Sequence, residues 1–493
     1  MSERKPLPSA SPEAVGIPSD AIRQYLEALE EKQLNMHSVL FVRHGKLCAE
    51  CYWKPFHRDR RHRMYSTSKS FTSAAIGILI GEGKLSLDDR ISQFFPEWIP
   101  ENPSEWMLNA KVRDLLRMST YLSTGSYWCG CDNWGRSFLE APATHKSGQV
   151  FAYDTSGTTF LDVLIWRLTG QEFTDYLEPR LFEPLGMSEG IWCVKTGCGH
   201  AWGGSGLQAT PRDLAKFALC IMNGGRSPEG RQLIPEWYVR EATSKQIDNT
   251  LYNSSFEEQQ GYGYQFWQLP RGGFGTLGMG SQSSYCFPEK DLIVVVNGDT
   301  QPRSNAMTNT LDPLFDLVWD RLSDEPLPEN AEAQLALDQY TNTRKMLVVP
   351  GKHDSPVAAQ VNGSTYRMTE NDMKIESLRF DFTDGAVNVH WVNDCGEHDL
   401  LCGFGENIAQ TISETRYGLT QIGTPEGRGL DCVASAGWVD ENSLYTNTWV
   451  NDVAFGSLRM QFVFDGDTVT MLSDKNAEWF LEDYRGFASG TRA

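Results

Sequence analysis

The alternation of apolar and polar positions predicts strands near both ends of the first two thirds of the chain, with helices between them. Residues 38–43 and 46–53 have the composition of two strands, and the two-residue His-Gly link between them is typical of a hairpin. Residues 293–297 form a third apolar run of strand length, whereas 66–81 and 307–322 show helical spacing. We therefore expect an α/β sandwich whose antiparallel sheet pairs early and late segments and carries helices on both faces.

A different pattern begins after residue 323. The next seven residues, Asp-Glu-Pro-Leu-Pro-Glu-Asn, are acidic and contain two prolines, as exposed linkers often do. Beyond an alanine-rich helical stretch, short alternating runs are separated by Asp-Gly turns, and they cover residues 379–382, 386–391, 443–449 and 458–464. The pattern predicts three parts: a first domain over 1–323, a linker over 324–349, and an antiparallel, barrel-like β domain over 350–493.

The charge of the chain narrows the classes of partner. Its formal net charge is -20, which disfavours phosphate backbones and anionic membrane surfaces. The apolar fraction of 40% is ordinary for a globular enzyme. The longest apolar runs, 74–80 and 293–296, are far shorter than the roughly 20 residues of a membrane helix, and the first residues lack the apolar core of a signal peptide. We expect a cytoplasmic protein that binds neither nucleic acid nor membranes.

The eleven cysteines fit that compartment, because thiols without an export signal are mostly reduced. Close pairs invite comparison with metal sites, but only the first has zinc-type spacing and it falls in a predicted strand pair. The pairs are Cys48 with Cys51, Cys129 with Cys131, and Cys193 with Cys198. We expect buried apolar side chains here, and neither a metal nor a cofactor.

The strongest local signal for chemistry is the segment Ser66-Thr-Ser-Lys69 at the start of a predicted helix. Residues three apart share a helix face, so the two side chains lie one turn apart. A serine hydroxyl becomes a nucleophile when a base takes its proton, and a neutral lysine can be that base. The spacing alone is common, and most instances are a helix cap beside a solvated lysine. Its context decides between the two interpretations.

Several motifs around this segment occur in the order of one family. They are Met64-Tyr-Ser-Thr-Ser-Lys-Ser-Phe, Leu115-Leu-Arg-Met-Ser-Thr, Phe151-Ala-Tyr-Asp-Thr-Ser, Leu181-Phe-Glu-Pro-Leu-Gly-Met, Gly203-Gly-Ser-Gly-Leu-Gln-Ala-Thr-Pro, and Leu277-Gly-Met-Gly-Ser-Gln. Over about residues 10–322 the chain resembles the class C β-lactamase superfamily. That superfamily also holds penicillin-binding carboxypeptidases, D-amino-acid peptidases, esterases and 6-aminohexanoate-dimer hydrolases, and the motifs are most similar to those of the dimer hydrolases. The resemblance implies the α/β sandwich together with a helical subdomain.

The resemblance also implies roles for individual residues. Ser66 is the expected nucleophile, and Lys69 and Tyr153 are the expected proton-transfer groups. The backbone N–H groups of Ser66 and Met279 are the expected oxyanion hole, a pair of donors that stabilises a tetrahedral intermediate.

The chain departs from the family at two positions. Thr155 stands where an asparagine is usual, and Thr276 stands where the third motif often has a cation. Both departures weaken the case for β-lactam hydrolysis. The expected substrate contacts are Thr155, Thr276, Gly278, Gln282, Tyr127 and Trp128. A basic cluster over residues 57–63 either attracts an anionic substrate end or forms ion pairs in a solvated loop.

We therefore expect a serine hydrolase that cleaves small amides or esters, with short peptides or amino-acid amides favoured. Two alternatives remain at this point: a penicillin-recognising or sensor-type binding protein with little turnover, and an acyltransferase that uses the same acyl-enzyme. The sequence leaves open whether the chain forms a homodimer. It also leaves open whether the second domain is a lid, a dimerisation surface or a support.

Overall fold

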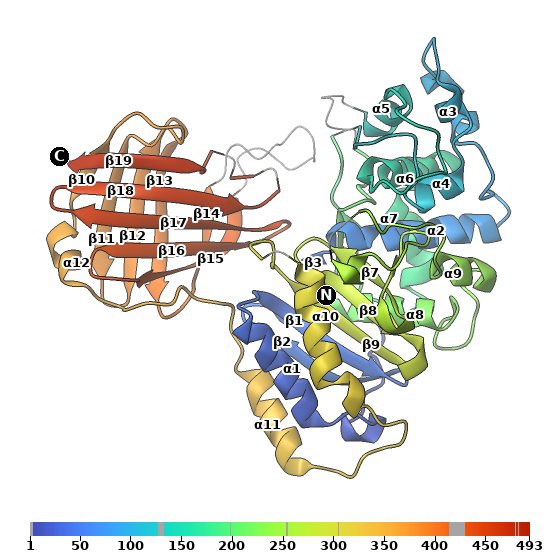
Figure 1. Ribbon diagram of the computed structural model, residues 1–493, viewed down its shortest axis with the longest axis horizontal. Coiled ribbons are helices and arrows are strands. Elements are labelled where there is room, and N and C mark those ends of the chain that lie inside the picture. The colour runs from blue at the N-terminus through green and yellow to red at the C-terminus, as the bar shows by residue number, and fades with distance from the viewer. Residues whose placement is uncertain are drawn as a thin grey trace. The chain divides into compact units, whose positions relative to one another are not determined.

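The computed structural model describes residues 3–126, 133–197, 199–252, 255–303, 305–413, 429–478, 480–481 and 483–493. The chain divides into two compact units, residues 1–345 and 346–493 (Figure 1). The division lies within the segment expected to be a linker. Helix α11 (Ala331–Asn342) packs against α1 (Ser19–Glu31) and buries Leu337, so it belongs to the first unit.

The central sheet of the first unit joins the two ends of that unit. Strands β1 (Met36–Arg43) and β2 (Lys46–Tyr52) form the expected hairpin, and β1 pairs on its other side with β9 (Leu292–Gly298). The strand order is β2-β1-β9-β8-β7-β6, and each pairing is antiparallel. The remaining strands are β6 (Trp267–Gln268), β7 (Phe274–Gly278) and β8 (Gln282–Phe287). The prediction that early and late segments pair in one antiparallel sheet is confirmed.

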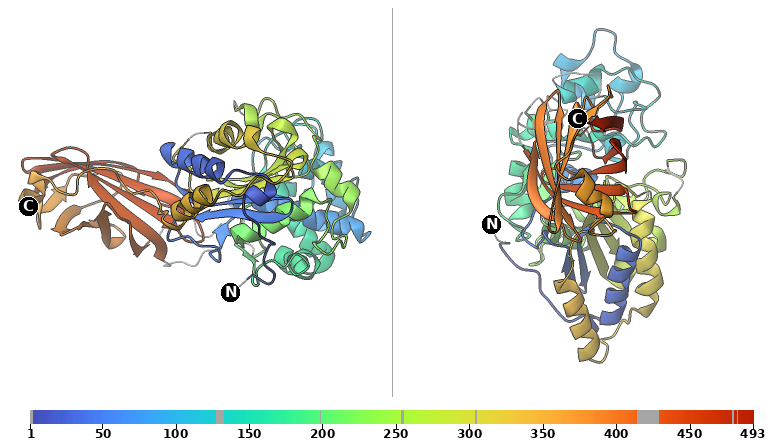
Figure 2. Two further views of the ribbon diagram at one scale, coloured as in Figure 1. Left: turned by 90° about the horizontal axis from the view of Figure 1, so that it is seen from below. Right: turned by 90° about the vertical axis from the view of Figure 1, so that its left-hand side faces the viewer.

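Helices cover both faces of this sheet (Figures 1 and 2). Every residue of β1 and β9 is buried. Leu40 of β1 lies in the apolar core that also contains Phe217 of α8 (Pro211–Met222). The next residue, Phe41, instead packs edge-on against Tyr25 of α1, with ring centroids 5.5 Å apart. Helix α10 (Ala306–Leu317) contacts α1 on that second face. Since successive side chains of a strand point to opposite faces, the strands read as continuous apolar runs.

A helical subdomain and a small sheet lie between β2 and β6 in the sequence. The sheet has the order β3-β5-β4, with β3 at His62–Arg63, β5 at Leu207–Ala209 and β4 at Trp192–Cys193. The helices are α2 (Ser68–Gly81), α3 (Glu105–Leu108), α4 (Val112–Leu116), α5 (Trp134–Glu140), α6 (Thr155–Thr169), α7 (Phe173–Leu177), α8, and α9 (Glu236–Ala242). Helix α2 contacts α6, α7 and α9, and almost all of its residues are buried. The subdomain therefore surrounds the helix that begins next to Ser66.

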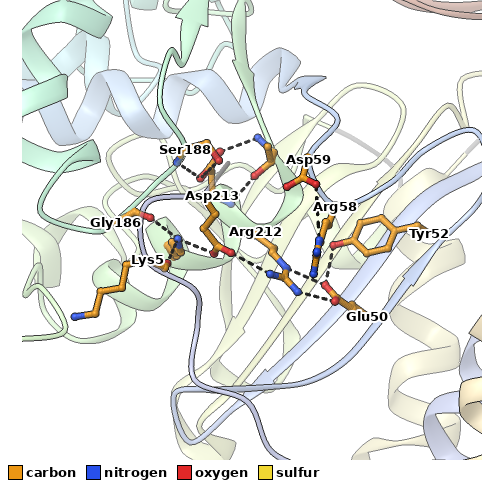
Figure 3. Close-up of polar contacts among 12 residues, drawn as sticks. Lys5, Glu50, Tyr52, Arg58, Asp59, Gly186, Ser188, Arg212 and Asp213 are labelled. Atoms are coloured by element: carbon orange, nitrogen blue, oxygen red, sulfur yellow. Dashed lines mark hydrogen bonds and ion pairs between the residues drawn. The ribbon is translucent and has the colours of Figure 1, made fainter. Parts of the chain in front are cut away.

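Helix α8 carries cations that form ion pairs with the first residues of the chain and with β2. Figure 3 shows Arg212 beside Glu50 of β2; its guanidinium lies 2.6 Å from that carboxylate and 2.9 Å from Glu3. Lys216 lies 2.7 Å from Glu3 as well. The helix begins with a capping box between Thr210 and Asp213, which satisfies amides of its first turn.

The second unit is a barrel-like antiparallel sheet. Its strands are β10 (Thr365–Met368), β11 (Ser377–Thr383), β12 (Ala386–Asn393), β13 (Gly396–Phe404), β14 (Ile408–Ser413), β15 (Gly429–Trp438), β16 (Ser443–Asn451), β17 (Phe455–Asp465), β18 (Thr468–Asn476) and β19 (Gly486–Arg492). A short helix, α12 (Pro356–Val361), precedes them. Pairing of β19 with β10 and of β13 with β15 closes the sheet on itself. The closing pair of β13 with β15 is parallel and joins Gly403 and Phe404 to Ser435 and Ala436, whereas the other neighbouring strands pair antiparallel. The predicted barrel-like fold is confirmed.

The described residues bear on two further sequence expectations, the absence of a membrane helix and the burial of the first cysteine pair. No helix among them has the length and apolarity of a membrane span. Cys48 and Cys51 are buried in β2, where burial raises the pKa of the Cys48 thiol to about 12. Cys129, Cys131 and Cys198 lie outside the described residues.

Because two histidines are buried in the first unit, we expect its free energy of unfolding to fall in acid. His37 and His62 stack on Phe56 with ring centroids 3.8 and 4.7 Å away. Burial lowers the pKa of His37 well below its ordinary 6.5 and lowers the pKa of His62 to about 3. Below pH 6.5 the unfolded chain therefore takes up protons that the folded chain does not. The free energy of unfolding should fall as the pH falls from 6.5 toward 3, by at most about 1.4 kcal/mol per pH unit for each histidine.

Thermal unfolding between pH 7.5 and 5 measures this slope while most carboxylates stay ionised. A His62→Phe variant keeps an apolar ring against Phe56 and should show a shallower slope than the wild type, even if it is less stable throughout. Equal slopes for the two proteins would show that His62 does not take part in the acid effect.

Candidate active site

Ser66 lies where the chain leaves β3 and enters α2. A single 3₁₀ turn, Tyr65–Thr67, carries it, and the α-helix begins at the next residue. Tyr65 has a left-handed backbone with φ of 44°, which turns the chain sharply. The Arg63 guanidinium fixes this turn: it lies 4.4 Å from the centre of the Tyr65 ring and donates to the Ser205 carbonyl at 3.0 Å. Ser66 itself is half-buried between two fully buried neighbours.

Lys69 lies against Ser66 inside the protein. Its Nζ is 2.9 Å from Ser66 Oγ and also donates to the Gly204 carbonyl at 2.6 Å. The side chain is only 1% exposed. The Gly204 carbonyl therefore helps to hold the amine within proton-transfer distance of the hydroxyl.

The segment that offers this carbonyl is clamped between α2 and α6. Gly203 N–H donates to the Asp162 carboxylate of α6 at 3.3 Å, and its carbonyl accepts from the Thr72 hydroxyl of α2 at 3.1 Å. A Cβ on Gly204 would lie 2.8 Å from the Thr155 methyl carbon, so only glycine fits this close approach.

Tyr153 reaches the same place from the start of α6. Its ring centre is 5.1 Å from Lys69 Nζ, and the ring stacks on Trp267 at 5.7 Å. The next residue, Asp154, caps α6 by accepting from Ser156 N–H at 2.8 Å. The buried cap fixes the chain where Tyr153 leaves it. The structure thus brings Ser66 and Lys69, at the start of α2, together with Tyr153, just before α6.

The turn between β7 and β8 lies against the nucleophile turn. Thr67, next to Ser66, donates to the Gln282 carbonyl at 2.6 Å. A Cβ on Gly278 would be 2.4 Å from the Met64 carbonyl, so the two backbones touch at that point. Met279 follows Gly278 directly and is half-buried. The backbones that carry the expected oxyanion donors, Ser66 and Met279, therefore lie side by side.

The chain is similar to known proteins of one family. The model of the beta-lactamase family matches residues 20–315. The chain belongs to the beta-lactamase family. Because this family places the chain among serine hydrolases, the predicted class of enzyme is confirmed.

Individual relatives of this beta-lactamase-family protein are distant. The 6-aminohexanoate-dimer hydrolase of Paenarthrobacter ureafaciens is 23% identical over 320 residues, which are 60% of this chain and 80% of the relative. A proposed 6-aminohexanoate-dimer hydrolase of Bacillus anthracis has a solved structure with a TM-score of 0.54 at 20% identity, covering 64% of this chain and 87% of that one. EstCE1, a hydrolase with promiscuous acyltransferase activity, gives a TM-score of 0.50 at 15% identity over 60% of this chain and 98% of its own. The two structures show the shared fold.

The structure buries two of the side chains expected to contact the substrate of this family member. Thr276 is 2% exposed, and its hydroxyl lies 3.0 Å from the Ser284 hydroxyl and 3.2 Å from that of Thr67. Gln282 is 0% exposed, and its side-chain oxygen accepts from Asn297 at 3.0 Å. Both side chains form hydrogen bonds inside the protein. Thr276 joins β7 to the nucleophile turn through Thr67, whereas the Gln282 side chain joins the start of β8 to Asn297 of β9.

Four further residues were expected to contact the substrate: Thr155, Gly278, Tyr127 and Trp128. Thr155 is half-buried at the first position of α6, beside Gly204. Gly278 has a backbone role, described above. Tyr127 and Trp128 lie outside the described residues.

The basic cluster has partners within the protein. Arg58 lies 3.7 Å from Asp59, Arg61 donates to the Glu189 carbonyl at 2.5 Å, and Arg60 lies 4.8 Å from the Phe56 ring. The contact of Arg58 with Asp59 fits the interpretation as an ion-paired loop, whereas His62 and Arg63 are buried in β3.

Gly278→Ala tests whether the β7–β8 turn must touch the nucleophile turn. The new methyl would push the turn away from Met64 and displace the Met279 amide, so kcat should fall by about 10²- to 10³-fold, the range for losing an oxyanion donor. Gly272→Ala is the control, because its methyl would meet no atom within 4 Å, although its positive φ adds strain. Wild-type kcat in the Gly278 variant would show that the contact does not matter for catalysis.

Proposed function

We propose that this protein hydrolyses small amides or esters through an acyl-enzyme on Ser66, with short peptides or amino-acid amides as favoured substrates. The observation that carries the proposal is the 2.9 Å approach of Lys69 Nζ to Ser66 Oγ in a buried setting. A solvated lysine over a helix cap would not be held in this way by a backbone carbonyl.

The proposed reaction uses these three side chains, Ser66, Lys69 and Tyr153. Lys69, in its neutral form, takes the Ser66 proton as Oγ bonds to the substrate carbonyl carbon. The resulting oxyanion accepts hydrogen bonds from the amides of Ser66 and Met279, each worth a few kcal/mol in the transition state. The bond from carbon to the leaving nitrogen or oxygen then breaks, and Tyr153 and Lys69 together return a proton to the leaving group. Water attacks the acyl-enzyme by the reverse proton path and releases the acid.

The relative from Paenarthrobacter ureafaciens supports an amide substrate, since it is named for hydrolysis of the dimer of an amino acid. Incubation with D- and L-amino-acid amides, short peptides and p-nitrophenyl esters tests the proposal. Intact mass would follow the enzyme, and chromatography would follow the products. We expect multiple turnovers with release of free acid. A stable adduct without turnover would instead indicate a sensor-type protein, and acyl transfer to an added amine in place of water would indicate a transferase.

We expect β-lactam hydrolysis to be weak or absent. Thr155 lacks the amide of the usual asparagine, and Thr276 offers neither a charge nor an accessible hydroxyl to a drug carboxylate. Loss of one charge-assisted hydrogen bond costs about 1.5–3 kcal/mol, which is roughly 10- to 150-fold in recognition. Nitrocefin hydrolysis measures this directly. Efficient turnover that disappears in Ser66→Ala would contradict the expectation.

A further inference from the structure

A cluster of aromatic side chains adjoins the catalytic residues. Tyr262 and Trp267 are buried, with ring centroids 5.0 Å apart, and Met118 completes their apolar core. Phe151 packs on Tyr262 at 5.3 Å, and Tyr252 packs on Phe151 at the same distance. No sequence motif predicts this cluster, which we call the aromatic wall: Phe151, Tyr153, Tyr252, Tyr262 and Trp267.

The aromatic wall reaches the reacting atoms through Tyr153. That ring lies 5.1 Å from Lys69 Nζ, which in turn lies 2.9 Å from Ser66 Oγ. Leu277, two residues before Met279, packs against the same cluster. A group bonded to the carbonyl that Ser66 attacks is therefore within a side chain's length of the wall.

Part of the aromatic wall stays accessible. Phe151 and Tyr153 are half-buried, and Tyr252 is 43% exposed. Burial raises the pKa of Tyr252 to about 12, with Glu258 adding to the effect, and burial also raises the pKa of Tyr262 well above its ordinary 10. Both phenols are neutral at physiological pH. Because each ring packs on others, the wall offers rigid, uncharged aromatic faces, which favour another planar ring in offset or edge-to-face contact.

The side of the substrate that meets the wall follows from the role of Tyr153. In the proposed function, on which this inference rests, Tyr153 delivers a proton to the leaving group. The rings that surround Tyr153 therefore line the space of the leaving group rather than that of the acyl group. We propose that the enzyme prefers substrates whose leaving amine or alcohol carries an aromatic ring, such as benzylamides and aryl-bearing esters.

Matched amides test this preference. An amino-acid benzylamide and the cyclohexylmethylamide of the same amino acid share their acyl group and differ only in aromaticity of the leaving amine. Both form the same acyl-enzyme, so deacylation is identical and kcat/KM reports the leaving-group side. We expect kcat/KM to favour the benzylamide by about 3- to 10-fold, the range for an added aromatic contact.

Variants locate the preference. Tyr252→Leu and Phe151→Leu should bring the ratio of the two kcat/KM values close to one. Trp237→Leu is the control, because Trp237 is a similarly exposed aromatic residue, 40%, on α9 and packs on Tyr238 rather than on the wall. It should keep both the ratio and the overall activity.

The outcomes separate the inference from the proposed function. A ratio near one in the wild type, with Ser66-dependent turnover intact, would overturn the aromatic preference and leave the hydrolase proposal standing. If neither amide is turned over, calorimetric titration of the Ser66→Ala protein with the same two compounds still decides. Tighter binding of the benzylamide by about 3- to 10-fold supports the inference, and equal affinities overturn it.

Discussion

Ser66→Ala should abolish amide and ester hydrolysis, with kcat at least about 10⁴-fold below wild type, because the acyl-enzyme needs an oxygen nucleophile at this position. The variant should also lose labelling by a fluorophosphonate. The variant loses the 2.9 Å contact of the half-buried hydroxyl with Lys69. Its fold should persist, because Arg63 and Thr67 fix the turn independently of that hydroxyl. Substrate turnover, labelling and thermal unfolding measure the three effects.

Ser70→Ala is the matched control for this result. Ser70 lies one turn further along α2, but its hydroxyl donates to the Gln265 carbonyl at 2.6 Å and is 1% exposed. Its loss should lower stability by about 1 kcal/mol and leave labelling intact. Undiminished labelling in Ser66→Ala would mean that another residue is the nucleophile.

Lys69→Met should lower kcat by about 10²–10⁴-fold while the protein stays folded, because methionine fills the same buried space and cannot take a proton. The Gly204 carbonyl loses its 2.6 Å donor, so some loss of stability should accompany the change. Steady-state kinetics on one amide and one ester, together with thermal unfolding, separate catalysis from stability.

Lys216→Met distinguishes loss of a base from loss of any buried lysine. Lys216 is 4% exposed and also donates to backbone carbonyls, those of Lys5 and Gly186, but on α8. Its removal should reduce stability and leave kcat within about threefold, as expected for a residue outside the reaction. Similar kcat values for the two lysine variants would argue against Lys69 as the base.

The sequence was most informative where function depends on neighbours along the chain. Ser66 and Lys69 lie three residues apart at the start of a helix, so their spacing alone predicts that the two side chains share one helix face. The pairing of β1 with β9 could also be expected, because the two strands contain the continuous apolar runs 39–42 and 292–296, which need cover on two faces.

The sequence was less informative where a side chain depends on distant partners. Thr276 and Gln282 occupy motif positions, and pattern alone assigns them to the substrate. Only the three-dimensional structure shows that the Thr276 hydroxyl bonds to Ser284 and Thr67, and that the Gln282 side-chain oxygen accepts from Asn297. A buried polar group must find a partner, and that partner is seldom adjacent in the sequence.

The aromatic wall and the acceptor for Lys69 could not be predicted either, because their partners are also distant in the sequence. The wall is assembled from residues between 151 and 267, which share no period along the chain. Gly204 sits within a recognisable glycine-rich string, but its importance lies in one carbonyl and in the space beside Thr155. In the sequence, the only sign of such a close approach between backbone and side chain is a glycine.

Acid quenching during turnover, followed by intact mass and peptide mapping, tests the central claim most directly. Within one turnover of a slowly deacylated ester, we expect a mass increase equal to the acyl group, located on the peptide that contains Ser66. The adduct should form and disappear at rates consistent with kcat, and it should not form in Ser66→Ala. Turnover without any adduct on Ser66, or an adduct on a different residue, would contradict the account.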